Sequence, residues 1–197
     1  PSDFDPTVLR RGNGPEPDTL DPQLARTDGA FNILRDVFEG LTAIGPDGSP
    51  VPAAAASWTV TPDGLEYRFT LRDGLRWSNG DVLTAADFVA GMRRLVDPAT
   101  ASPYAQFIDP VLNAGAITRG EKKPEELGVT APDDRTVLVR LATPAPYLLG
   151  LLSQPGTFPV HGPSLAAHGA EYARPGKLVS NGAFVLADWV IGSHVVL

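Results

Sequence analysis

Alternation between apolar and polar side chains predicts two half-buried β-strands. The first is Leu65–Arg72, which alternates strictly and lies between the turn sequences Pro62–Gly64 and Asp73–Gly74. The second is Thr136–Leu141. Three further apolar stretches also predict strands, and these are Val8–Arg11, Ala183–Val190 and His194–Leu197.

Apolar residues at intervals of three and four predict two longer helices. The first begins after Thr27 or Asp28, either of which can cap it. The second begins at Thr84, has Asp87 where a capping box needs an acidic residue, and ends before Pro98. Shorter helices are predicted over 147–152 and over 164–172, the latter capped by Ser164. The two longer apolar faces are Phe31, Leu34, Phe38 and Leu41, and Ala85, Phe88, Val89, Met92, Leu95 and Val96.

This mixture of helices and strands predicts a mixed α/β fold. At 197 residues the chain is long enough to bury a core in one or two compact units. The net charge of −7 argues against nucleic acid, because binding to phosphates needs a basic surface. The absence of cysteine excludes disulfides, thiolate metal sites and cysteine nucleophiles.

No group of residues has the arrangement of a catalytic or metal site. The three histidines, His161, His168 and His194, are far apart and lack the spacing of metal ligands. The carboxylate pairs 125–126 and 133–134 are expected on the solvated surface, as are Arg93 and Arg94. The sequence contains no nucleophile–base motif, so we expect neither an enzyme nor a cofactor. Trp58, Trp77 and Trp189 are expected in the core.

Tyr104 stands apart because it lies in a loop, Asp97–Tyr104, and not on an amphipathic face. Loops held by a rigid scaffold are enriched in binding residues, and a tyrosine can both stack on a ligand and hydrogen-bond to it. The alternative is that Tyr104 anchors its own loop.

Several motifs, in order, resemble the oligopeptide-binding proteins that serve ABC importers, known as solute-binding protein family 5. The resemblance runs from about Leu9 to Leu197. The motifs are Leu20–Pro22, Arg35–Leu41, Ala56–Trp58, Tyr67–Gly74, Trp77–Gly80, Leu83–Val89, Asp97–Tyr104, Lys122–Pro124, Leu127–Val129, Pro144–Tyr147, Asn181–Phe184 and Trp189–Val190.

The resemblance implies a periplasmic-binding-protein-like architecture with two large lobes and a smaller domain. Residues 1–38 would begin the first lobe, 39–159 would form the smaller inserted domain, and 160–197 would return to the first lobe. The second large lobe would be absent from this chain. The chain starts without methionine and stops in an apolar strand, so we expect a piece of a longer, processed protein.

The resemblance also implies a function. Such a protein captures short peptides through backbone hydrogen bonds and delivers them to the membrane permease of an ABC transporter. It works as a monomer, in the periplasm or on the extracellular face of the membrane, either free or lipid-anchored.

The residues that match ligand-lining positions of the family are Arg26, Thr27, Asp28, Gly29 and Tyr104. The resemblance implies that extended backbone at 26–29 lies along the peptide and that Tyr104 faces the cleft. The family's oligopeptide branch has an acidic residue in place of Arg26 and an apolar one in place of Asp28. The class of ligand is therefore open, and a nickel chelate, haem, an oligosaccharide or a murein peptide is an alternative cargo. A third alternative is a structural or interaction module without a ligand of its own.

Overall fold

The computed structural model describes residues 7–197. Its main sheet has the antiparallel strand order β3-β4-β6-β5, and the antiparallel pairs β1–β2 and β7–β8 form two separate smaller sheets. The strands are β1 Thr42–Ile44, β2 Pro50–Pro52, β3 Ala55–Val60, β4 Glu66–Leu71, β5 Val129–Asp133, β6 Thr136–Arg140, β7 Asp188–Val190 and β8 His194–Val196. The helices are α1 Asp28–Val37, α2 Ala85–Val96, α3 Ala114–Thr118, α4 Leu148–Leu151 and α5 Gly162–His168, with 3₁₀ turns η1 Ala105–Ile108, η2 Pro124–Glu126, η3 Pro155–Thr157 and η4 Gly169–Ala173.

The two predicted central strands are confirmed as β4 and β6, which pair with each other. In β4 the side chains of Tyr67, Phe69 and Leu71 are buried while Arg68 and Thr70 between them are exposed, as alternation requires. Strand β6 does not alternate in this way, because four of its five residues are buried. Like β4, it is an inner strand of the sheet, with β4 and β5 as its neighbours.

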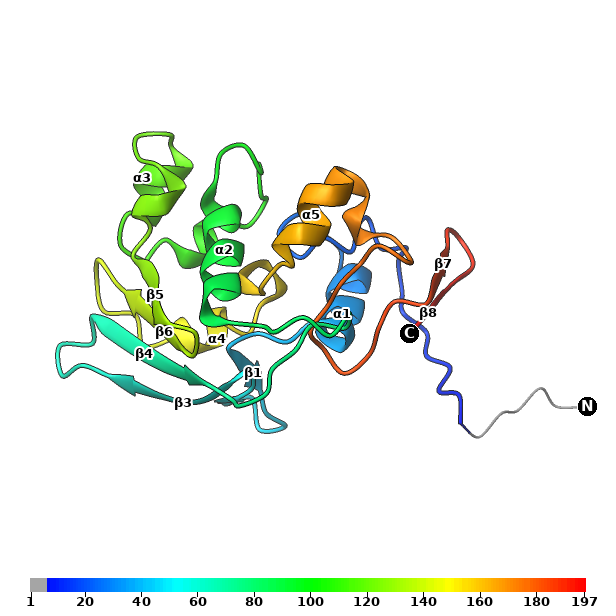
Figure 1. Ribbon diagram of the computed structural model, residues 1–197, viewed down its shortest axis with the longest axis horizontal. Coiled ribbons are helices and arrows are strands. Elements are labelled where there is room, and N and C mark those ends of the chain that lie inside the picture. Colours follow the sequence, from blue (N-terminus) through cyan, green and yellow to red (C-terminus); the bar gives the residue numbers. More distant parts are fainter. Residues whose placement is uncertain (1–6) are drawn as a thin grey trace, which may run out of the picture.

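Helix α2 crosses the sheet and packs against β5 and β6 (Figure 1). Its predicted start is confirmed, since the Thr84 backbone N–H donates to the Asp87 carboxylate at 2.8 Å in a capping box. All six residues of its predicted apolar face are buried. The helix ends at Asp97, before Pro98, because proline cannot continue the hydrogen-bond pattern.

Helix α1 is capped by Thr27, whose hydroxyl accepts a hydrogen bond from the Ala30 N–H at 3.2 Å. Its buried face differs from the predicted stripe. Leu34 is buried within the helix, whereas Phe38 and Leu41 are buried beyond its end and Phe31 is only half-buried. The face against the core is completed by Gly29, Ala30, Ile33 and Val37.

Two predictions at the ends of the chain were wrong, one of them in part. Val8–Arg11 forms no strand within the described residues, and Leu9 is 88% exposed. Residues 183–187 are not a strand either, because the Phe184 N–H bonds to the Asp36 carbonyl beside the end of α1. The strand starts later, at β7, and pairs with β8 at the end of the molecule away from the main sheet (Figure 1).

Helix α5 begins earlier than predicted and has a different cap. The ring of His161 accepts the hydrogen bond from the Ser164 N–H through Nδ1, at 3.2 Å. The hydroxyl of Ser164 instead donates to the Lys177 carbonyl at 2.6 Å.

Of the three tryptophans, Trp77 is in the core as predicted, while Trp58 and Trp189 pack at its edge and are half-buried.

Candidate ligand-binding segment

Arg26–Gly29 forms the entry to helix α1 and changes conformation half-way. Thr27 is extended, with φ −97° and ψ 147°, whereas Asp28 and Gly29 are already in the first turn of the helix. Arg26 and Asp28 are exposed, Thr27 is half-buried, and Gly29 is buried. Extended backbone is therefore found at Thr27 and stops at Asp28, so it covers less of the segment than the family resemblance implies.

The position of Gly29 has a packing reason. A Cβ atom there would lie 2.2 Å from the carbonyl oxygen of Pro15, so only glycine fits without a backbone shift. The Asn13 side chain also donates to the Gly29 carbonyl, at 2.9 Å. These contacts tie the start of α1 to the preceding segment, 13–15.

Asp18 holds the extended part of the segment, a role that the sequence analysis missed. Its carboxylate accepts a hydrogen bond from the Arg26 N–H at 3.0 Å. It also accepts from the Thr27 hydroxyl at 3.1 Å and, in a longer contact, from the Thr27 N–H at 3.4 Å. The sequence carried no signal for this contact, because aspartate side chains that form turns or caps bond to amides only a few positions away, and these partners lie eight and nine positions away.

Tyr104 lies beside this segment although 78 positions separate it from Arg26. Its hydroxyl is 3.4 Å from the Arg26 carbonyl oxygen. Its ring stacks on Phe107 at a centroid distance of 4.7 Å and meets Phe31 of helix α1 at 5.6 Å. All three rings are half-buried, so they form an aromatic surface next to the exposed Arg26.

The loop that carries Tyr104 is fixed to the N-terminal segment by polar contacts. The Ser102 hydroxyl donates to the Gln23 carbonyl at 2.6 Å, and Gln23 in turn donates to the carbonyl oxygens of Gly156 and Phe158. Arg94 binds both Asp21 and the Gln23 side-chain oxygen, at 2.6 to 2.7 Å. The prediction that Arg94 is solvated was wrong, because a carboxylate from a distant segment reaches it.

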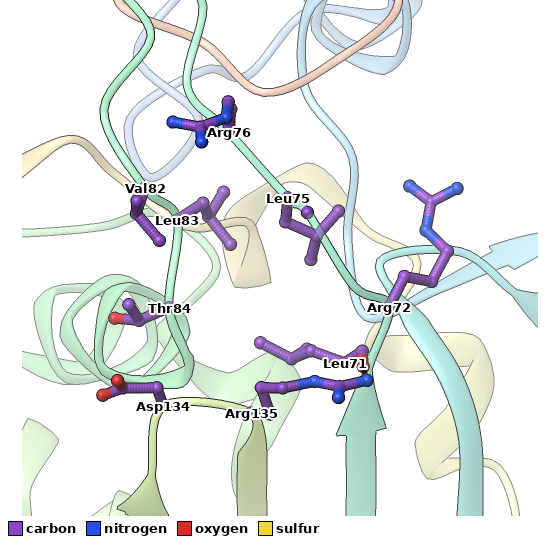
Figure 2. A pocket seen from close by; sticks show the side chains of 10 residues that line it. Leu71, Arg72, Leu75, Arg76, Val82, Leu83, Thr84, Asp134 and Arg135 are labelled. Carbon is purple, nitrogen blue, oxygen red and sulfur yellow. Dashed lines mark hydrogen bonds between the residues drawn. The ribbon is translucent and has the colours of Figure 1, made fainter.

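Two hollows lie elsewhere on the molecule. The smaller, about 240 Å³, is shown in Figure 2, where three arginines surround apolar side chains that include Leu75 and Val82. Each arginine has a partner: Arg72 binds Glu39, Arg76 binds the Gly80 carbonyl, and Arg135 binds Asp73. Two of the three arginines are therefore ion-paired with a carboxylate, and Arg76 is hydrogen-bonded to a neutral carbonyl.

The larger hollow, about 800 Å³, lies between the end of α1, strand β1 and the loop at 181–183. Glu39 lies at the edge of this hollow. Burial raises the pKa of Glu39, and the nearby positive charge of Arg72 lowers it by a smaller amount. Asn181 binds both the N–H and the carbonyl of Glu39, at 3.1 and 2.9 Å. Neither hollow is lined by Tyr104 or by residues 26–29.

The remaining polar candidates have structural or surface positions. His161 is buried and, besides capping α5, binds the Asp81 carboxylate through Nε2 at 3.0 Å. Glu125, Glu126, Asp133 and Asp134 are exposed. Within residues 7–197 no group of three or more His, Asp or Glu side chains is placed to hold a metal ion, and no helix is long and apolar enough to span a membrane.

Comparison with known proteins identifies the family. Residues 49–197 match the model of bacterial extracellular solute-binding proteins, family 5 (middle). The chain belongs to this family. Family members that resemble it are solute-binding proteins and not enzymes, which confirms the predicted class. The predicted periplasmic or extracellular location is confirmed in the same way.

Two curated relatives from Escherichia coli match almost the whole chain. One is the probable deoxycholate-binding periplasmic protein YgiS, 43% identical over 95% of this chain and 36% of its own length. The other is the periplasmic oligopeptide-binding protein OppA, 42% identical over 96% of this chain and 35% of its own length. The chain thus spans about a third of the length of these relatives.

Solved structures agree with the fold. Haemophilus influenzae OppA in complex with RPPGFSPFR matches 93% of this chain and 36% of its own, with a TM-score of 0.90 and 40% identity. The Escherichia coli murein tripeptide binding protein MppA matches 91% of this chain and 35% of its own, with a TM-score of 0.88 and 39% identity. The mixed α/β fold is therefore that of part of a periplasmic oligopeptide-binding protein.

Proposed function

We propose that this chain supplies one wall of the ligand site of an ABC importer's binding protein, which captures short peptides and delivers them to the membrane permease. Residues 1–38 and 160–197 would belong to the first lobe and 39–159 to the smaller domain. A second lobe beyond this chain would close over the peptide. The observation that carries the proposal is the contact of Tyr104 with the Arg26–Thr27 segment, because it unites the two ligand-lining elements that family resemblance selects.

The local chemistry supports a peptide ligand. The exposed Arg26 offers a main-chain carbonyl, and a main-chain group of this kind can bind a peptide N–H without reading the peptide's side chains. The neighbouring rings of Tyr104, Phe107 and Phe31 offer apolar area together with one hydroxyl. The peptide complex of Haemophilus influenzae OppA, whose fold this chain matches, favours the same class of cargo.

The test is peptide binding by the full-length protein, measured calorimetrically with trialanine and with a mixed peptide library. We expect Tyr104→Ala to weaken binding about 30-fold, the scale of a buried aromatic contact. The Thr27→Ala/Tyr104→Ala double variant should bind more weakly still. Tyr147→Ala is the matched control, since Tyr147 is 62% exposed and belongs to a different loop. Unchanged affinity in the double variant would refute the assignment of these residues.

A second cargo has a specific argument in its favour. YgiS, named for probable deoxycholate binding, is as similar to this chain as OppA is. The exposed guanidinium of Arg26 beside an aromatic surface suits an amphipathic anion as well as a peptide. Native mass spectrometry of the purified full-length protein distinguishes them, because a ladder of co-purified peptides indicates the first cargo and one uniform mass the second.

A further inference from the structure

The contacts of Asp18 go beyond what a surface turn requires. Asp18 is itself exposed, yet both of its carboxylate oxygens bind groups eight and nine residues away in the chain. Its partners are the N–H of Arg26 and both the N–H and the hydroxyl of Thr27. These are two of the five residues assigned to the ligand site, and they immediately precede helix α1.

The hydrogen bonds of Asp18 change what the segment offers to a ligand. The amide donors of Arg26 and Thr27 are taken up, and the Thr27 carbonyl accepts the Phe31 N–H of helix α1 at 3.0 Å. Among residues 7–197, the Arg26 carbonyl meets only the Tyr104 hydroxyl, at 3.4 Å, which is long for an O–H···O bond. That carbonyl keeps acceptor capacity for an incoming N–H group.

We propose that Asp18 is a positioning residue of the ligand site, which holds the Arg26–Thr27 backbone so that it meets a ligand through the Arg26 carbonyl. The group that fits this carbonyl is an N–H donor, such as a peptide amide. The inference rests on the proposed function for its ligand. The positioning itself can be observed without one.

The first experiment needs no ligand. In the full-length protein, amide proton resonances of Arg26 and Thr27 are compared between wild type, Asp18→Ala and Asp18→Asn. We expect upfield shifts of both amides in Asp18→Ala, because a carboxylate-bound amide proton is deshielded, and smaller shifts in Asp18→Asn, which keeps one acceptor oxygen. Asp47→Ala is the control, because Asp47 forms a similar turn with Ser49 in a distant loop. Unmoved resonances in Asp18→Ala would overturn the proposal even if no peptide binds.

The second experiment separates positioning from simple support of the fold. We expect Asp18→Ala to lower trialanine affinity about tenfold, the equivalent of one charge-assisted hydrogen bond, while the melting temperature stays that of Asp47→Ala. Asp18→Asn should recover part of the affinity. A lower melting temperature with unchanged affinity would assign Asp18 a structural role only. A wild-type protein that binds no peptide would refute the proposed function, while the amide shifts would still decide the role of Asp18.

A double-mutant cycle tests the link to Tyr104. Because the Tyr104 hydroxyl contacts the carbonyl that Asp18 orients, the affinity losses of Asp18→Ala and Tyr104→Phe should be less than additive. Strictly additive losses would show that the two residues act independently and would contradict the proposal.

Discussion

The guanidinium of Arg94 forms two hydrogen bonds with the carboxylate of Asp21, from its two terminal nitrogens to the two oxygens, at 2.7 and 2.6 Å. This paired geometry joins helix α2 to the segment that leads into the ligand-lining residues. Arg94 also lies over the ring of Tyr172, 5.8 Å from its centroid, and burial raises the Tyr172 pKa well above its usual value. The cluster therefore connects three parts of the chain that are far apart in sequence.

We expect Arg94→Ala to lower the free energy of unfolding by about 3 kcal/mol, because it leaves the carboxylate of Asp21 buried without its partner. The side chains of Asp21 and Arg94 are 5% and 19% exposed, so solvent replaces the lost contacts poorly. Urea denaturation measures the change. The Asp21→Asn/Arg94→Met double variant should lose less than the sum of the single variants.

The control for this pair is Arg119→Ala, which breaks an ion pair with Glu121 on an exposed surface. Exposed pairs contribute little to stability, so its urea midpoint should equal that of the wild type. If Arg94→Ala behaved like Arg119→Ala, the buried pair would have no stabilising role.

Gly91 in the middle of helix α2 should resist replacement by alanine. Gly→Ala in a helix ordinarily stabilises by about 1 kcal/mol. Here the added Cβ would lie 2.4 Å from the Phe158 carbonyl oxygen, so we expect Gly91→Ala to destabilise the protein by roughly 1–3 kcal/mol through overpacking. The matched control is Gly150→Ala in α4, where no atom of the described residues lies within 4 Å of the added Cβ apart from the adjacent residues and the helix's own backbone. Thermal unfolding of both variants decides the prediction, and a more stable Gly91→Ala protein would contradict it.

Gly29→Ala tests whether the glycine of the ligand-lining segment is needed for packing. The added Cβ would meet the Pro15 carbonyl at 2.2 Å, so we expect a loss of roughly 1–3 kcal/mol in unfolding free energy. Asn32→Ala, at an exposed position of the same helix, is the control and should leave stability unchanged. Equal melting temperatures for the two variants would show that the contact with Pro15 relaxes without cost.

The hydrogen bonds of Glu16 to the β7–β8 hairpin predict that the stability of the protein depends on pH. Its carboxylate accepts hydrogen bonds from the Trp189 ring N–H at 2.7 Å and from the Gly192 N–H at 3.0 Å, and these lower its pKa. A lowered pKa in the folded state contributes stability above the ordinary value of 4.5, and this contribution is lost as the pH falls through the lowered pKa. Glu16→Gln imitates the protonated form. We expect Glu16→Gln to melt at a lower temperature than the wild type at pH 7, and this difference should shrink below pH 4.5. A difference that does not change with pH would refute the linkage.

Much of the candidate site was predictable and some of it was not. Family resemblance selected residues 26–29 and Tyr104 from motifs in the sequence, and Thr27 was a recognisable helix cap. Asp18 was missed because its partners are backbone amides, which no side-chain motif reveals. Arg94 was misplaced on the solvated surface because its partner Asp21 lies 73 positions earlier in the chain.

Local signals in the sequence determined the type and the limits of two elements. Strand β4 follows from its alternation, and helix α2 follows from its capping box, its apolar face and Pro98, because each of these signals acts within a few residues. The motifs and their order also identified the family.

Only the tertiary structure decided which distant residues meet. It left Val8–Arg11 without a partner strand, bound residues 183–187 to the end of α1, and placed Tyr104 beside Arg26. The physical reason is that strand pairing, buried ion pairs and aromatic contacts depend on groups far apart in the chain. These interactions form only when distant segments pack together, so no single segment of the sequence reveals them.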